Sequence, residues 1–361
     1  MKKRFGIIAV AAALLGIMSG CAAPTPGGSG PTTTAVASQS PTPTVASAPT
    51  VRVPATCDQL VPAAVRDAAT GTHVALASDL PGGHSALMYA DRRVGALVCS
   101  WEGGITDPTQ PWLKPSVWVG VLPGSSPDAF SFFKGNSGAE DQSDPFFVCG
   151  GLSPATCAFG GTRDGYQWLG TVSVGSGSID QTAARAVFDS ARSVVAGLGA
   201  PGPLWQPQGG SLRGVTTTDD FAPLDRLQAA AGTGPLRVVK SEGGENEVSA
   251  LGSSEIVGGN WAFFIADGSE GFSVGVLPGG GFGFDDRHEH PLAGTTDIRR
   301  AAIGEEAYFS RPGSTVPGDT TPSRDTLLDV KVKNSWVQVG SVALTDDQLL
   351  AVARAVIENL S

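Results

Sequence analysis

The sequence is poor in charge, above all in positive charge, and it lacks a long apolar run. Charged residues make up 16% of the 361-residue chain, and 34 acids against 24 Lys and Arg give a formal net charge of −10. Without a cluster of Lys and Arg to meet a phosphate backbone, we expect no nucleic-acid partner. The longest apolar run, residues 7–18, is shorter than the roughly 20 residues that span a bilayer as a helix. We therefore expect no transmembrane helix in the mature protein.

The first 21 residues have the pattern of a bacterial lipoprotein signal. A basic start precedes the apolar run, and Met18-Ser19-Gly20-Cys21 has the lipobox order of an apolar residue, two small residues and a cysteine. We expect lipidation of Cys21 and attachment to the extracytoplasmic side of the cell membrane through lipid chains such as palmitate. The alternative is a plain secretory signal that happens to contain a cysteine.

Residues 22–54 follow as a linker. They are mostly Ala, Pro, Thr, Ser and Gly, with Arg52 as the only charge. Such a segment cannot bury enough apolar surface to offset the entropy lost on ordering, so we predict a disordered tether. Its reach is at most on the order of 100 Å. The sequence leaves open whether its Thr and Ser residues carry O-linked sugars.

Cysteine is scarce, and its number agrees with export. Five cysteines less Cys21 leave Cys57, Cys99, Cys149 and Cys157. An even number in an exported chain favours disulfides, and three pairings are possible. We favour Cys57–Cys99 and Cys149–Cys157, because Gly150, Gly151 and Pro154 suit a closed turn in the short loop. A four-cysteine zinc site is the rival, but its close CxxC pairs are absent.

A six-residue repeat suggests a duplicated domain. Val-Gly-Val-Leu-Pro-Gly occurs at residues 119–124 and again at residues 274–279. Each copy reads as the end of a strand, stopped by a turn. Aligning Trp168 with Trp336 and Leu198 with Leu360 supports the repeat. We expect a first domain at 55–200, an interdomain linker at 201–214 and a second, cysteine-free domain at 215–361.

The hydrophobic pattern predicts an α+β fold. Because strands are followed by one terminal helix in each half, we expect two tandem antiparallel sheets, each covered on one face by helices. The expected helices are 59–65, 181–198, 221–230 and 346–360. The expected strands are 92–101, 116–122, 166–174, 260–266, 272–277, 328–332 and 335–342, with Lys333-Asn334 at a hairpin turn. Most of the tryptophans fall on these strands and are interpreted as core.

The sharpest candidate for chemistry is Asp285-Asp286-Arg287-His288-Glu289-His290. His288 and His290 with neighbouring carboxylates could ligate a transition metal, although no third, fixed ligand is evident. A polar loop after the glycine-rich turn 279–283 is the plainer interpretation and the one we favour. We therefore predict no catalytic residues, no metal and no cofactor.

Several of these features together resemble the small lipoproteins of actinobacteria, a family without an established activity. The resemblance rests on the lipobox, the Pro/Thr/Ser tether, Cys57-Asp58-x-Leu60, Cys99-Ser100-Trp101 and the closing helix. It implies an extracytoplasmic, disulfide-bonded α+β domain, distantly like the sensor domains of mycobacterial-type receptor kinases. It covers residues 1–200 and reaches 205–361 only through the internal repeat. It carries over Cys21 and the disulfide cysteines alone.

These observations favour a non-enzymatic, lipid-anchored envelope protein that binds a small ligand or an envelope partner. A metal-dependent envelope hydrolase using His288 and His290 is the alternative. A transporter's solute-binding lipoprotein is disfavoured, because its lobes alternate helices and strands, a pattern absent here.

Overall fold

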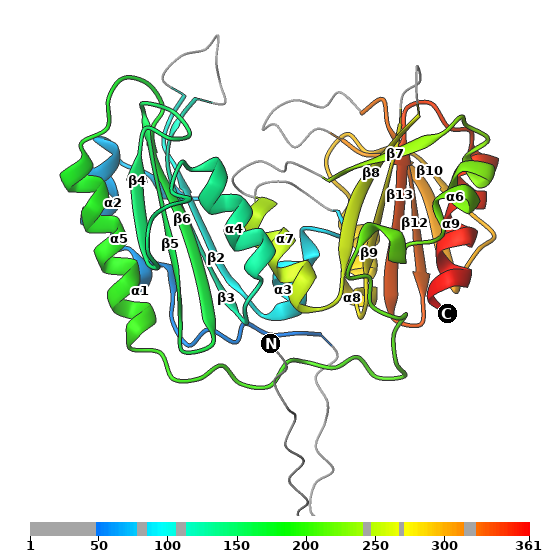
Figure 1. Ribbon diagram of the computed structural model, residues 1–361, viewed down its shortest axis with the longest axis horizontal. Coiled ribbons are helices and arrows are strands. Elements are labelled where there is room, and N and C mark those ends of the chain that lie inside the picture. Colours follow the sequence, from blue (N-terminus) through cyan, green and yellow to red (C-terminus); the bar gives the residue numbers. More distant parts are fainter. Residues whose placement is uncertain (1–47, 78–84, 106–112, 241–246, 267–270, 314–322) are drawn as a thin grey trace, which may run out of the picture. The chain divides into compact units, whose positions relative to one another are not determined.

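The computed structural model describes residues 48–77, 85–105, 113–240, 247–266, 271–313 and 323–361 (Figure 1). Cys21 and most of the predicted tether lie outside these residues. Within the described ranges, no helix is long and apolar enough to cross a membrane. Arg52 donates its backbone N–H to the Gly95 carbonyl, and Val53 is buried, so the folded part already includes these two residues.

The fold is α+β, with two tandem antiparallel sheets, as expected. The first sheet has the order β1-β2-β3-β6-β5-β4 and the second β10-β11-β12-β13-β9-β8-β7. In spatial order the first sheet comprises Ala75–Leu76, Leu97–Glu102, Pro115–Pro123, Tyr166–Val174, Thr156–Arg163 and Phe146–Cys149. The second comprises Thr296–Arg300, Glu306–Arg311, Thr326–Val332, Ser335–Ser341, Phe272–Leu277, Asn260–Ala266 and Leu236–Lys240. The predicted turn Lys333-Asn334 joins β12 to β13 with positive φ at both residues, as a type I′ turn requires.

Helices contact both faces of each sheet, whereas the sequence predicted cover on one face only. On the first sheet, α1, α2 and α5 lie on one face and α4 on the other, and α6 and α9 cover one face of the second sheet (Figure 1). The helices are α1 Cys57–Leu60, α2 Ala63–Thr70, α3 Tyr89–Val94, α4 Pro127–Asn136, α5 Gln181–Ala196, α6 Leu224–Ala231, α7 Glu247–Ile256, α8 Gly281–Glu289 and α9 Asp346–Leu360, with a 3₁₀ turn at Thr218–Asp220.

The terminal helices α5 and α9 occupy equivalent places. Asp180 caps α5 through the N–H groups of Thr182 and Ala183, and Thr345 caps α9 in a capping box with Gln348. Superposing the two N-caps aligns two buried stripes residue for residue. They are Ala184, Val187, Phe188, Ala191 and Val195 in α5, and Leu349, Val352, Ala353, Val356 and Leu360 in α9. The predicted match of Leu198 with Leu360 is therefore three residues out of register.

The sheets confirm the repeat but correct a second alignment. Gly120 and Gly275 hold the same place in β3 and β9, and their partners on the neighbouring strands are Leu169 and Gln338. In this register Trp336 matches Gln167, not Trp168. Trp168 faces the core under α5, whereas Trp336 faces the opposite side of its sheet and packs against Tyr89. The two tryptophans are thus on different faces.

Each repeat contributes one helix that packs at the junction with the other repeat. Helices α3 and α7 precede equivalent strands, and each ends at a Val-Gly pair, Val94-Gly95 and Val257-Gly258, with the glycine at positive φ. They pack on one another, and α7 also contacts β3 and α4 of the first repeat. The Val-Gly-Val-Leu-Pro-Gly turns meet these crossing helices. A Cβ on Gly124 would lie 2.9 Å from Ile256, and one on Gly279 would lie 2.6 Å from Arg93.

Two sequence expectations are wrong in this region. The predicted strand 92–101 begins as helix α3 and becomes β2 only at Leu97. The predicted turn is present at Gly279, but helix α8 takes up residues 281–289 of the predicted glycine-rich turn and polar loop. Its glycines allow close packing, since a Cβ on Gly283 would come within 2.6 Å of the Tyr89 ring. Helix propensity is low for Gly, so tertiary contact decides the structure here.

Candidate functional site

The two histidines proposed as metal ligands have separate environments. His288 on α8 lies between the rings of Phe284 and Tyr308, with centroids 4.5 and 4.4 Å away. His290 is exposed and its Nδ1 lies 3.4 Å from Asp286 Oδ1. Burial lowers the pKa of His288, which favours a neutral ring. In the described part of the chain, no group of three or more His, Cys, Asp or Glu could hold a metal ion.

A hollow lies on the second sheet, on the face opposite α9. This hollow, the trough, has a volume of about 440 Å³, which is within the range of small-molecule sites. Its described lining comes from β8, β9, β12 and β13 and from a short segment of the first repeat that leads into α3. The lining residues are Ser85, Leu87, Trp261, Phe263, Ile265, Gly271, Ser273, Asp325, Leu327, Gln338, Gly340, Ser341 and Val342.

Cross-strand pairing arranges the trough in rows. One row runs Trp261, Gly275, Gln338 and Asp329, and the next runs Phe263, Ser273, Gly340 and Leu327. Alternation of side chains along the strands places Ile265, Gly271, Val342 and Asp325 in a third row. Three such rows extend over about 13 Å of strand.

Small residues on the two central strands make the floor, and larger ones on the flanking strands make the walls. Trp261 and Phe263 on β8 meet edge to face, with centroids 4.6 Å apart, and Phe263 is 40% exposed. Leu327 forms the opposite wall. The floor glycines are needed for this shape: a Cβ on Gly275 would lie 2.7 Å from Trp261, and one on Gly340 2.6 Å from Leu327.

The first repeat fills the equivalent space. Its second row runs Ser100, Trp118, Thr171 and Ala158, so Trp118 stands where the second repeat has Ser273. The Trp118 ring is buried in a cluster with Phe133 of α4 and Phe146 of β4. The two repeats therefore differ in where they place the aromatic residue. In the first repeat, Trp118 fills the centre of the sheet face. In the second repeat, Trp261 and Phe263 line a hollow at the equivalent place.

A buried polar network supports the inner end of the trough. Asp329 Oδ1 accepts hydrogen bonds from Trp336 Nε1 at 2.9 Å and from Gln338 Nε2 at 2.7 Å. Its Oδ2 accepts from Arg287 Nε at 3.0 Å, so the buried carboxylate is paired with a cation of α8. These bonds fix the side chain of Gln338, which lines the trough.

Ser273 occupies the middle of a Gly-x-Ser-x-Gly sequence, residues 271–275, without the geometry of a hydrolase nucleophile. It lies within β9 and not on a strand-to-helix turn. Its Oγ lies 3.5 Å from the Gly340 carbonyl oxygen, and Phe263 and Gly340 are its cross-strand neighbours. The described lining includes no histidine. The arrangement suits a binding surface better than acyl transfer.

The trough wall is joined to the junction of the repeats. Leu87 packs with Met88, Ala250, Leu251 and Trp261. Asp91 on α3 is fully buried. It accepts hydrogen bonds from two hydroxyl groups of α7, Ser249 Oγ at 2.8 Å and Ser253 Oγ at 2.6 Å. Burial raises the pKa of Asp91 to about 6. The first repeat thus contributes a wall to the hollow of the second.

Further polar contacts tie α3 to α8. The Tyr89 hydroxyl donates to Asp286 Oδ2 at 2.5 Å, and burial together with this bond raises the pKa of Tyr89. Arg92 Nη1 lies at the same distance from the same oxygen. The contacts come from the two sides of the junction, so they fix the position of α3 against the second sheet.

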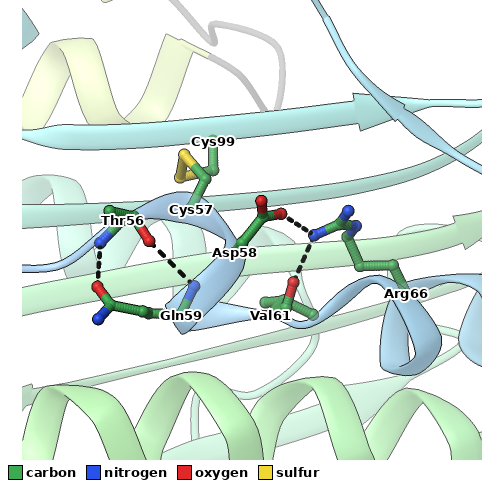
Figure 2. Close-up of a disulfide and its surroundings, with 7 residues drawn as sticks. All are labelled: Thr56, Cys57, Asp58, Gln59, Val61, Arg66 and Cys99. Atoms are coloured by element: carbon green, nitrogen blue, oxygen red, sulfur yellow. Dashed lines mark hydrogen bonds and ion pairs between the residues drawn. A yellow bond between two sulfur atoms is a disulfide. The ribbon is translucent and has the colours of Figure 1, made fainter.

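The cysteines pair as favoured from the sequence. Cys57 joins Cys99, and Cys149 joins Cys157 on the adjacent strand. Figure 2 shows the first bridge beside the capping box of α1, in which Gln59 Oε1 accepts from the Thr56 N–H at 2.8 Å. Arg66 bonds Asp58 and the Val61 carbonyl nearby. The bridges lie in the first repeat, away from the trough.

Sequence reasoning missed the trough residues. Trp261 was interpreted as core, yet it is only partly buried and forms a wall. The alternating small residues of β9 were the available signal, because Gly and Ser in a strand interior often mark a close approach or an open site. No family model, curated protein or solved structure matches this chain.

Proposed function

We propose that this protein is a lipid-anchored component of the cell envelope that binds a small ligand in the trough and does not catalyse a reaction. The contrast between the plugged face of the first repeat and the hollow face of the second supports this function best. Two copies of one fold share a register, and only one replaces the central Trp118 with a serine.

The lining supports binding without chemistry. It combines aromatic and aliphatic walls with a few fixed polar groups, which is the usual character of a ligand site. Among the described lining residues Asp325 is the one titratable group, and it is exposed. General acid–base or nucleophilic catalysis needs a second positioned group, such as a base beside Ser273.

The anchor is proposed from the signal sequence. The mature protein would be held by lipid at Cys21 on the extracytoplasmic side, with residues 22–54 between lipid and folded domains. Metabolic labelling with a palmitate analogue tests this part. The wild type should be labelled and sediment with membranes, and Cys21→Ser should be unlabelled and released. Labelling of Cys21→Ser would contradict the anchor.

Native mass spectrometry of residues 22–361, incubated with an extract of the cell envelope and then repurified, tests binding. The wild type should retain a small molecule, and Ser273→Trp should lose it, because the new ring copies the plug of the first repeat. Ser193→Trp, an exposed position on α5, is the matched control and should retain the ligand. A ligand held equally by Ser273→Trp would place the binding site elsewhere.

A further inference from the structure

The polar groups of the trough are selective for one kind of ligand. We propose, on the basis of the binding function above, that the trough takes an uncharged amphiphile. This is a molecule with an apolar body that carries hydroxyl or amide N–H groups as hydrogen-bond donors. Three properties of the lining favour such a ligand: its apolar surface, its hydrogen-bonding groups and its charge.

Apolar contact dominates the walls. The rings of Trp261 and Phe263 form the wall on β8. Leu327 on β12 and Val342 at the end of β13 add aliphatic surface, and Leu87 adds more from the first repeat. The floor between them is made of glycine and serine, so a flat or slender apolar body can lie against the sheet. Each buried CH₂ group of such a body strengthens binding roughly fourfold.

The trough offers acceptors to a ligand, of which the Gln338 carbonyl is the most buried. One N–H of the Gln338 amide donates to Asp329, and the Gln338 carbonyl oxygen faces a ligand as an acceptor. Ser341 is already satisfied within the protein, because it donates its hydroxyl to the Gly271 carbonyl at 2.9 Å and accepts from the N–H groups of Ala343 and Leu344. The carboxylate of Asp325 is an acceptor too. A ligand that donates hydrogen bonds can satisfy these groups, whereas one with acceptors alone would leave Gln338 desolvated and unpaired.

The charge of the described lining disfavours an anionic head. No Lys, Arg or His occurs among the described lining residues, and Asp325 would repel a carboxylate or phosphate. A cation is also disfavoured, because its attraction to the exposed Asp325 is screened by water while the apolar walls would strip its hydration. An uncharged head avoids both costs.

A series of probes with one tail and three heads tests this inference. Octyl glucoside, octylammonium and octanoate share an eight-carbon chain and carry a neutral, a cationic and an anionic head. Binding to residues 22–361 is measured by Trp fluorescence and by titration calorimetry below the concentration at which micelles form. We expect octyl glucoside to bind at least about tenfold more tightly than octanoate and several-fold more tightly than octylammonium.

Two variants separate the site from its selectivity. Ser273→Trp should abolish binding of every probe, whereas Ser193→Trp should change none. Asp325→Asn should strengthen octanoate binding about two- to fivefold and leave octyl glucoside unchanged, since it removes an exposed charge and keeps the shape.

The outcomes distinguish the two proposals. If octanoate or octylammonium binds more tightly than octyl glucoside and Ser273→Trp abolishes that binding, the trough is the site and the ligand class is wrong. If probes bind Ser273→Trp as well as the wild type, the trough itself is not the site. If none of the probes binds the wild type, the uncharged-amphiphile inference is overturned, while the native-ligand experiment still decides the binding function.

Discussion

The carboxylate of Asp91 accepts a hydrogen bond from the Ser253 hydroxyl, 2.6 Å away, across the junction of the two repeats. Asp91 is fully buried on α3, and the described contacts give it two hydroxyl partners and no cation. A buried carboxylate with this environment favours the protonated form, which explains the rise of its pKa to about 6. Protonation of Asp91 in mild acid should therefore stabilise the junction.

Asp91→Asn should change the pH dependence of stability. The folded pKa of about 6 exceeds the ordinary value of 3.8, so Asp91 contributes most stability below pH 4 and loses it as pH rises to 6. The loss is on the order of 3 kcal/mol. Urea unfolding at pH 4, 5, 6 and 7 measures the free energy of unfolding of both proteins. The value for the variant should rise relative to that of the wild type by about this amount as pH rises. A constant difference between the two proteins would contradict this account.

Arg93→Met should weaken the same junction by removing donors. Arg93 is buried, donates Nη1 to the Trp205 carbonyl at 2.6 Å and Nε to the Pro278 carbonyl at 3.2 Å, and lies over the Trp205 ring. The variant would leave these carbonyls without a charged partner, at a cost of about 2–4 kcal/mol in unfolding free energy. Arg354→Met, at an exposed position on α9, is the control and should cost under about 0.5 kcal/mol. Equal losses in urea titrations would refute the role of Arg93.

How far the sequence predicts this structure depends on whether the apolar residues of an element recur at a regular spacing. Strand β13 and helix α9 each show apolar residues at a regular spacing, so their bounds were predicted closely. Helix α7 is enclosed by both repeats and buries Ser249, Ala250 and Ser253 on several sides. It has no polar face to contrast with an apolar one, so periodicity gives no signal.

The site was harder to predict than the fold. Gly271, Ser273 and Gly275 alternate along β9, but a floor exists only because β13 brings Gly340 beside Ser273. That pairing joins segments more than sixty residues apart, and no local pattern encodes it. The cysteine pairing was within reach because the choices were few, whereas the lipid anchor at Cys21 stays a prediction.

Gly275→Ala should distort the trough. The new methyl group would lie 2.7 Å from the Trp261 ring, so the ring must move. We expect a loss of about 1–3 kcal/mol in unfolding free energy and a shift in Trp emission, with weaker ligand binding. Gly104→Ala, where the added Cβ meets no atom within 4 Å, is the control. An unchanged emission spectrum in Gly275→Ala would show that Trp261 does not rest on this glycine.

Removing the Cys57–Cys99 bridge should destabilise both repeats together. The bridge closes a loop with a sequence separation of 42, and its loss as a Ser pair should cost about 4 kcal/mol. The cysteines lie in the first repeat, but α7 of the second repeat packs on β3 and on α3, so the second sheet depends on the first. Removing Cys149–Cys157, with a separation of 8, should cost less, about 2.5 kcal/mol.

Calorimetry of the Cys57→Ser/Cys99→Ser variant should show one transition at a lower temperature, with probes in each repeat melting together. Two separated transitions, the second at the wild-type temperature, would mean that the crossed helices α3 and α7 do not couple the repeats.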